Sequence, residues 1–415
     1  MPLMQYLRFF VANRRFVAFG FLAALASSFG QTYFLGTFSA SIESELSLSH
    51  SGWALVYLVG TLASAIALPT TGKLIDLMPL PRYTASALVV LIAGTAVMAF
   101  GSGIVMLTMA IFLLRQGGQG LMNHLSITSM TRYFEEGRGR AIALATLGFA
   151  AGEAILPRLA LSMMNTWSWR TTFAIVTGLL VVVVFPLLLW LLKGHEARHE
   201  RYVATQLRDV ATKSSVARSW TRGEVLRDVR FYLILPGTLA PAMIITALFF
   251  THLSLAEAKG WSGEWIMGSY GIYALASTVV GLVCGTLIDK VGGTRLVPLM
   301  LLPMALALVV AGTLREPWSV WPYFIFLGGS VGIGHTAVSA MWAELYGVGS
   351  LGAIKSLVTA LAVLSSAIGP VIIGGLMDIG VPIERVCLFF AGYALFATVL
   401  LVGALRPNRN VQATP

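Results

Sequence analysis

Few ionisable side chains interrupt the apolar stretches of this sequence, and two of them could carry out proton and anion chemistry. Arg115 and Glu153 lie in apolar segments that follow one another along the chain. A nearby cation favours the charged form of a carboxyl group, so gaining or losing an arginine partner changes its proton affinity. An arginine released from such a pair could bind a carboxylate through two hydrogen bonds. Arg115 is therefore a candidate substrate-binding residue and Glu153 a candidate proton carrier, and a static ion pair between the two helices is the alternative.

Other polar side chains in apolar segments extend this set. Arg158 lies five residues after Glu153 and is a second possible partner for its carboxylate. His124 is a further candidate for proton coupling, because histidine titrates near neutral pH. The remaining candidates could contact a substrate, although helix packing explains each of them as well: Gln31, Tyr33, Tyr270, Tyr273 and His335.

One short motif has the spacing of a zinc site. The sequence His195-Glu196-Ala-Arg-His199 is an H-E-x-x-H pattern, which on a helix places two imidazoles on one face with a glutamate as general base. A catalytic zinc site also needs a third ligand and a shaped, dry cavity. This motif lies in a charge-rich segment just beyond an apolar one, so we expect a solvated linker and no metal site.

The composition shows what kind of structure must position these residues. Of 415 residues, 57% are hydrophobic and only 11% are charged, and the mean hydropathy is +0.81. Soluble domains carry about 25% charged residues. The apolar residues form blocks of roughly 20, the length of a helix that crosses a bilayer. Twelve spans are predicted, all helical because a span must satisfy its own backbone hydrogen bonds: 16–42, 52–75, 83–101, 104–132, 139–163, 169–192, 231–256, 264–288, 295–314, 320–345, 352–377 and 385–405.

The net charge of +10 has a membrane explanation. With the N-terminus inside, most of the 28 Lys and Arg fall in cytoplasmic segments, and the external loops hold Arg170, Lys259, Arg315 and Arg385. This asymmetry predicts that both termini are cytoplasmic. The basic residues are too dispersed for a nucleic-acid interface, and the lipid bilayer is the expected environment.

The chain divides into two similar halves. A polar segment, 193–230, separates a six-helix half, 1–192, from a second, 231–415. At an offset of 213 residues, Tyr57 matches Tyr270, and Asp76 matches Asp289. At an offset of 211, His124 matches His335. Such repeats are common in secondary transporters, whose substrate site lies between the repeats near the bilayer midplane. The sequence thus predicts an all-α membrane protein with twelve helices in two six-helix bundles related by pseudo-two-fold symmetry.

A loop motif points to a family. The segment Gly285-Thr-Leu-Ile-Asp-Lys-Val-Gly-Gly-Thr-Arg295 resembles the loop signature of the major facilitator superfamily, and Gly72-Lys-Leu-Ile-Asp76 resembles its first part. The resemblance implies that this loop controls the conformational equilibrium through charge contacts at the helix ends. It assigns a gating role to four residues: Asp76, Asp289, Lys290 and Arg295.

Two further segments resemble the monocarboxylate-transporter-like bacterial branch of that superfamily: Tyr133–Ala141 and Trp342–Lys355. The branch implies proton-coupled symport of a small organic anion by alternating access. A proton-coupled exporter of drugs or metabolites is the alternative. Two rivals of other classes are an intramembrane protease built around His195 and His199, and a transporter-like sensor.

The partners follow from this hypothesis. They are a small-molecule substrate, a proton and the lipid bilayer, with no cofactor, no metal, no nucleic acid and no enzymatic activity. We expect a monomer in the cell inner membrane.

Overall fold

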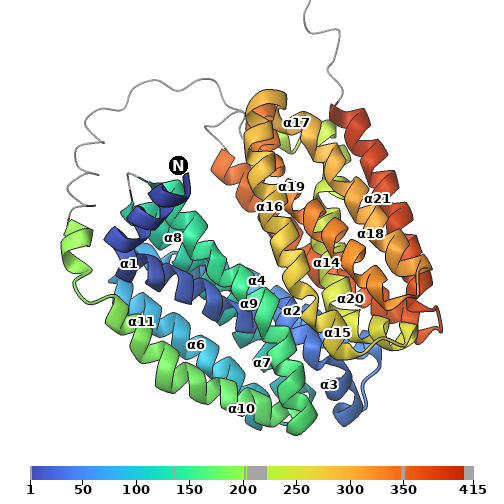
Figure 1. Ribbon diagram of the computed structural model, residues 1–415, viewed down its shortest axis with the longest axis horizontal. Coiled ribbons are helices and arrows are strands. Elements are labelled where there is room, and N and C mark those ends of the chain that lie inside the picture. Colours follow the sequence, from blue (N-terminus) through green and yellow to red (C-terminus); the bar gives the residue numbers. More distant parts are fainter. Residues whose placement is uncertain (1, 135–136, 201, 203–221, 347–350, 406–415) are drawn as a thin grey trace, which may run out of the picture. The chain divides into compact units, whose positions relative to one another are not determined.

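The computed structural model describes residues 2–134, 137–200, 202, 222–346 and 351–405 (Figure 1). This part of the chain is helical throughout and contains no β-strand, which confirms the all-α prediction. Twelve helical segments are long and apolar enough to cross a membrane: Arg8–Gly30, His50–Leu77, Leu80–Phe100, Gly103–Tyr133, Arg138–Thr166, Trp169–Leu191, Val229–Lys259, Gly263–Ile288, Gly293–Thr313, Pro317–Tyr346, Leu357–Asp378 and Ile383–Leu405.

Side-chain caps mark where several spans begin. Ser49 accepts a hydrogen bond from the N–H of Gly52 at the start of α4 (His50–Gly72). Ser168 caps α10 (Trp169–Leu179) through the N–H of Thr171 in the same way. Each cap satisfies a backbone donor that the first helical turn leaves free, which defines the helix start at the edge of an apolar segment.

The first of two compact units comprises residues 1–215 together with 249–253 and 263–271. Helix α1 (Pro2–Ser27) packs against α8 (Asn123–Tyr133) and α9 (Arg138–Thr166). Helix α7 (Gly103–Leu114) packs against both α4 and α6 (Leu80–Phe100), and α10 packs on α6. A π-helical turn, η4 (Leu180–Val184), joins α10 to α11 (Phe185–Leu191).

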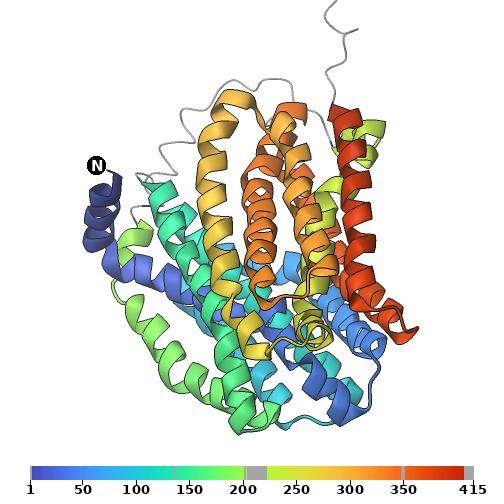
Figure 2. The same cartoon turned by 45° about the vertical axis from the view of Figure 1, so that its right-hand side comes forward.

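The second unit comprises residues 216–248, 254–262 and 272–415. Its long helices are α18 (Leu301–Thr313), α19 (Val320–Tyr346), α20 (Leu351–Asp378) and α21 (Ile383–Leu405), together with α14 (Val229–Lys259) outside 249–253 and α16 (Tyr270–Val291) from residue 272 on. Helix α18 packs against α19 and α21, and α18 and α21 run alongside each other in both views (Figure 1, Figure 2). A short helix, α17 (Gly293–Leu296), packs on α19.

The helix boundaries differ from the sequence prediction in one place that matters. A continuous helix over 16–42 is predicted, but the first span ends at Gly30, where a 3-10 turn and an extended Gln31 interrupt the helix. The predicted linker, 193–230, lies for the most part outside the described residues, and the six-helix halves on either side of it stay a prediction.

Candidate functional site

The break in the first span exposes backbone groups inside the first unit. Helix α1 ends at Ser27, the 3-10 turn η1 (Ser28–Gly30) follows, and Gln31 has an extended backbone with φ −89° and ψ 153°. The chain then continues through α2 (Thr32–Leu35), η2 (Gly36–Phe38) and α3 (Ser39–Leu46). Interrupted spans leave carbonyl groups outside the regular helical ladder, where they can bind other groups.

Arg115 uses one of these carbonyl groups. It begins η3 (Arg115–Met122), a π-helical segment between α7 and α8, and only 1% of its surface is exposed. Its terminal nitrogen donates to the Gly30 carbonyl at 3.1 Å, and its guanidinium carbon lies 5.3 Å from the centre of the Tyr57 ring. The Tyr57 hydroxyl shares a 2.6 Å hydrogen bond with Thr32.

The guanidinium of Arg115 nevertheless retains binding capacity. Its buried Nε has no hydrogen-bond partner, and none of the ion pairs among the described residues includes Arg115. A buried cation without a counter-charge is costly in a membrane interior. The arrangement is therefore suited to an anionic ligand.

Glu153 approaches the same break from α9. It is 7% exposed, and the preceding Gly152 lies so close to Ser28 that a Cβ there would come within 2.0 Å of the Ser28 hydroxyl oxygen. The Tyr33 hydroxyl donates to that oxygen at 2.8 Å. The Tyr33 ring lies 5.6 Å from that of Phe149, about one helical turn before Glu153 on α9. A Cβ at Gly271, next to Tyr270, would lie 3.9 Å from Cβ of Ala154, next to Glu153. The structure therefore groups Glu153 with the predicted residues Tyr33 and Tyr270.

No ion pair joins Glu153 to Arg115 among the described residues. Arg158 is exposed, and its guanidinium lies beside Gly268 of α15 (Gly263–Gly268). The two arginines that could have neutralised the carboxylate therefore have other surroundings, and the static ion pair that we considered is absent.

A buried histidine completes the surroundings of Tyr270. Nδ1 of His252 and the Tyr270 hydroxyl are 2.6 Å apart, and both side chains are fully buried. Gln31, at the break itself, is also buried, with 8% of its surface exposed.

Three predicted residues lie elsewhere. His124 is half-buried on α8, hydrogen-bonded to the Thr128 hydroxyl at 3.3 Å and next to Gly72 at the end of α4. Tyr273 and His335 belong to the second unit, where the Tyr273 ring lies 6.4 Å from Phe324 and His335 is exposed. The structure does not group them with Arg115 or Glu153.

The predicted gating residue of the first unit, Asp76, forms an ion pair with an arginine that we did not predict. Asp76 lies in α5 (Leu74–Leu77) and pairs with Arg132 near the end of α8. Arg132 also donates to the carbonyl of Ile75 at 3.1 Å. The loop after α4 is thus attached to the end of α8.

In the second unit, a glutamate that we did not assign holds the corresponding loop. The Glu344 carboxylate, on α19, accepts hydrogen bonds from the N–H groups of Gly293 and Thr294, at 2.5 and 2.9 Å. The predicted gating residues Lys290 and Arg295 are exposed, and the Asp289 side chain lies outside the described part of the structure. Glu344 occurs in a segment that already resembled the superfamily, which was the available signal.

Within the H-E-x-x-H motif, Glu196 and His199 are exposed as expected, but His195 is buried. His195 is only 6% exposed, because its ring stacks on Phe16 at 5.5 Å and meets the edge of Tyr133 at 4.6 Å. Burial, together with the charges of Arg198 and His199, lowers the pKa of His195 to about 4. Three or more His, Cys, Asp or Glu side chains suited to a metal ion do not come together anywhere in the described ranges.

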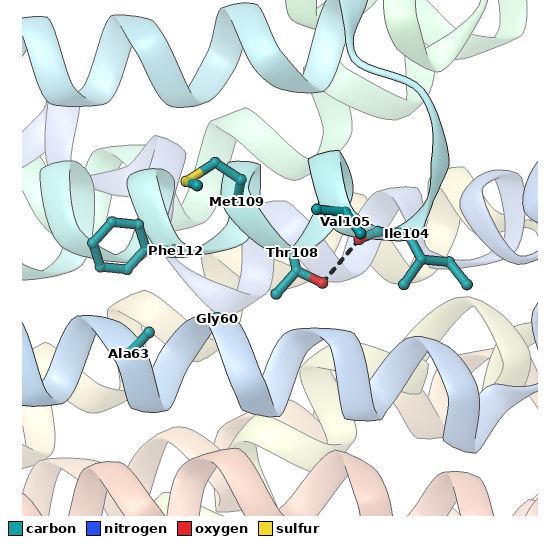
Figure 3. A pocket seen from close by; sticks show the side chains of 7 residues that line it. All are labelled: Gly60, Ala63, Ile104, Val105, Thr108, Met109 and Phe112. Carbon is teal, nitrogen blue, oxygen red and sulfur yellow. Dashed lines mark hydrogen bonds between the residues drawn. The ribbon is translucent and has the colours of Figure 1, made fainter.

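An open apolar groove of about 420 Å³ lies between α4 and α7 (Figure 3). Gly60 and Ala63 line it on one side, and five residues from Ile104 to Phe112 line it on the other. Its one hydroxyl, that of Thr108, is bonded to the Ile104 carbonyl at 2.9 Å. The groove offers no polar group to a substrate.

Sequence reasoning missed several residues of the site. Tyr57, whose ring faces Arg115, could have been found from the sequence. It matches Tyr270 in the internal repeat, and Tyr270 was already a candidate substrate contact. Nothing in the sequence distinguished Thr32, Phe249 and Phe250 from ordinary packing residues.

Comparisons with known proteins agree with the architecture. Two crystal structures of a bacterial homologue of the human lysosomal transporter Spinster, both inward-facing, are similar to this chain with a TM-score of 0.68 and 13% identity. The occupied form matches over 98% of both chains, and the unoccupied form over 95% of this chain and 97% of the other. At this identity the likeness shows the fold alone. No curated protein matches the sequence. A sequence model of the Major Facilitator Superfamily matches residues 20–370, so the chain belongs to that superfamily.

Proposed function

We propose that this superfamily member is a secondary active transporter that moves a small organic anion together with a proton. The observation that carries the proposal is the buried guanidinium of Arg115, which has no carboxylate partner among the described residues and one unsatisfied N–H group. Family membership favours transport over enzymatic catalysis.

Arg115 is the proposed anion site. The Gly30 carbonyl and the Tyr57 ring hold the guanidinium in place, so its planar fork can accept a carboxylate without first reorganising. An incoming anion supplies the missing counter-charge, which is worth most in a water-poor interior. Gln31, Tyr33 and Tyr270 are the proposed polar contacts for the rest of the substrate.

Glu153 is the proposed proton carrier. Its carboxyl group is buried, and the preceding Gly152 packs against Ser28 in the break of the first span. An anion that crosses together with a proton leaves the net charge of the site unchanged. This avoids moving an unbalanced charge through the membrane, which is expensive.

The conformational cycle is proposed to be alternating access by two six-helix halves, 1–192 and 231–415, joined by the linker 193–230. The Asp76–Arg132 pair and the loop with Asp289, Lys290 and Arg295 would control it. We propose a monomer in the cell inner membrane with both termini in the cytoplasm. A cysteine placed at the exposed Lys193, in a background without Cys284 and Cys387, should then react only with reagents added from the cytoplasmic side.

A thermal-shift screen tests the substrate class, because a ligand that binds only the folded state raises the apparent stability. Lactate, succinate and benzoate are the anionic probes, and tetraphenylphosphonium represents cationic drugs. We expect an anion to stabilise the wild type, more strongly at lower pH, and to have no effect on Arg115→Ala. Stabilisation by the cation alone, unchanged in Arg115→Ala, would support the alternative of a drug exporter and would refute the anion site.

A further inference from the structure

Two consecutive phenylalanines of α14 lie against the tyrosines that neighbour the two charged residues of the site. Phe249 and Phe250 belong to the short stretch 249–253 that is part of the first unit. They are 4% and 3% exposed. Successive helical side chains diverge by about 100° around the axis, so the two rings point to different places.

The Phe249 ring covers the surroundings of Glu153. Its centre lies 6.0 Å from that of Tyr33, 5.2 Å from that of Tyr270 and 5.3 Å from the His252 ring. Tyr33 packs on Phe149 of α9, one turn before Glu153, and Gly271, next to Tyr270, lies close to Ala154, next to Glu153. Phe249 is thus the apolar cover of the proposed proton site.

The Phe250 ring covers the surroundings of Arg115. It stacks on Trp53 at 5.4 Å with an interplanar angle of 21°, and its centre is 5.1 Å from that of Tyr57. Tyr57 in turn faces the Arg115 guanidinium and bonds to Thr32. Phe250 is thus the apolar cover of the proposed anion site.

One backbone contact holds both rings in place. A Cβ atom at Gly36 in η2 would lie 2.3 Å from the carbonyl oxygen of Phe249 and 3.0 Å from Cα of Phe250. Only glycine allows the stretch 249–253 to come this close to η2. If the backbone of Phe249 and Phe250 moved away from Gly36, both rings would move away from the tyrosines that they cover.

We infer that Phe249 and Phe250 form a single gate, which opens the proton site and the anion site in one movement of the stretch 249–253 away from η2. The apolar rings keep water, and with it protons, from Glu153 as long as the anion site is also closed. This inference deepens the proposed function and rests on its assignment of Arg115 and Glu153. On this inference, Phe249 and Phe250 are positioning residues for the coupling of proton and anion transport.

Proton leak tests the half of the gate at Phe249 and requires no knowledge of the substrate. Proteoliposomes containing the full chain and a pH-sensitive dye are placed under a potassium-valinomycin potential without any organic anion. We expect Phe249→Ala to raise proton entry roughly tenfold over wild type, equivalent to about 1.4 kcal/mol of barrier. Phe249→Leu, which keeps an apolar cover, should stay near wild type. The matched control is Phe389→Ala on α21, where the ring is 61% exposed.

The leak must pass through Glu153. We therefore expect Phe249→Ala with Glu153→Gln to return to the wild-type rate. A leak that persists in this double variant, or a folded Phe249→Ala protein that leaks no more than wild type, overturns the gate.

Thiol accessibility tests the half of the gate at Phe250. Thr32→Cys, in a background without Cys284 and Cys387, places a thiol beside Tyr57, and the anionic reagent sulfonatoethyl methanethiosulfonate is the probe. We expect Phe250→Ala and Gly36→Ala each to accelerate the reaction several-fold, and Phe249→Ala to do so much less. Gly36→Ala leaves both rings intact, so it decides the question if a ring-deleted variant fails to fold. An unchanged rate in Gly36→Ala overturns the gate.

A different experiment tests the proposed function separately from the gate. If Glu153→Gln accumulates substrate like wild type under a pH gradient, Glu153 is not the proton carrier, even when Gly36→Ala and Phe250→Ala expose the thiol as expected.

Discussion

The hydroxyl groups of Thr32 and Tyr57 lie 2.6 Å apart and connect the interrupted first span to α4. Through this bond, the residue that follows Gln31 fixes the ring that faces Arg115. The break in the first span therefore positions the Arg115 guanidinium in two ways: directly through the Gly30 carbonyl, and indirectly through Thr32 and Tyr57.

The Tyr57 ring should matter more to anion binding than its hydroxyl does. We expect Tyr57→Leu to weaken binding of a stabilising anion roughly tenfold, because a desolvated cation–π contact is worth about 2 kcal/mol and helps to hold the guanidinium. Tyr57→Phe keeps the ring and loses only a hydrogen bond worth about 1 kcal/mol of folding stability. Thermal-shift titrations compare the two variants, and equal losses of affinity would contradict the role of the ring.

Glu153→Gln should separate coupling from binding. Glutamine keeps the shape and hydrogen-bonding capacity of the side chain but cannot ionise. We expect pH-gradient-driven accumulation to be abolished while substrate exchange stays measurable, because exchange needs no net proton movement. Counterflow and accumulation in proteoliposomes measure the two activities. Accumulation with the pH dependence of the wild type would rule out Glu153 as the proton carrier.

Arg115 and Glu153 should behave as independent sites in a double-mutant cycle. They form no ion pair, so we expect the effects of Arg115→Ala and Glu153→Gln on folding stability to add within about 0.5 kcal/mol. Denaturation of the wild type, both single variants and the double variant in the same detergent measures the coupling. If the double variant is far more stable than the sum of the two single effects predicts, the hypothesis of a structural ion pair between Arg115 and Glu153 is supported instead.

His195 should make the protein less stable in acid. Its pKa is about 4 in the folded state, below the ordinary value of about 6.5 in the unfolded chain, so protonation favours unfolding. Stability is unaffected above about pH 6.5 and falls as the pH drops from there to about 4, with a total loss on the order of 3 kcal/mol.

The neighbouring charged and titratable side chains provide the controls. Tyr133, Arg198 and His199 face the same imidazole. We expect His195→Phe, which preserves the stack on Phe16, to lose most of this acid dependence, and His199→Ala to retain it. Unfolding of the purified protein between pH 4 and pH 7 measures it, and identical pH profiles for wild type and His195→Phe would contradict the assignment.

Asp76→Asn should slow turnover without unfolding the protein. The carboxylate is 60% exposed, and exposed ion pairs contribute less than about 1 kcal/mol of stability. We expect a nearly unchanged melting temperature, unchanged anion affinity and a lower transport rate, with recovery of the rate in Asp76→Glu. Normal rates combined with lost affinity would show that the Asp76–Arg132 pair has no gating role.

The hydropathy pattern predicts the twelve helices because the bilayer imposes a length and a composition on every span. It does not predict the break at Ser28–Gly30, because its cause lies in tertiary contacts: a Cβ at Gly30 would lie 2.0 Å from the carbonyl oxygen of Leu114. The depth of Arg115 and Glu153 in their spans indicates that they are buried, but not which groups they contact. Their lack of a mutual ion pair depends on the direction of each side chain.

At His195 the sequence predicts exposure, and the structure shows burial. The charges around it indicate a solvated segment, and the aromatic rings that bury it, Phe16 and Tyr133, are far away in the sequence. Local polarity predicts the exposure of the segment on average, and His195 is the residue that faces inward.

The π-helical segment η3 affects how a residue-by-residue scan of the fourth span must be interpreted. In a π-helix each N–H bonds five residues back and not four, so side chains advance around the axis by a smaller angle per residue. A helical wheel drawn at one constant angle from Gly103 to Tyr133 therefore assigns the residues after Met122 to the wrong face. Labelling patterns along this span will change phase between α7 and α8, and an alignment with a purely α-helical relative needs a gap within 115–122.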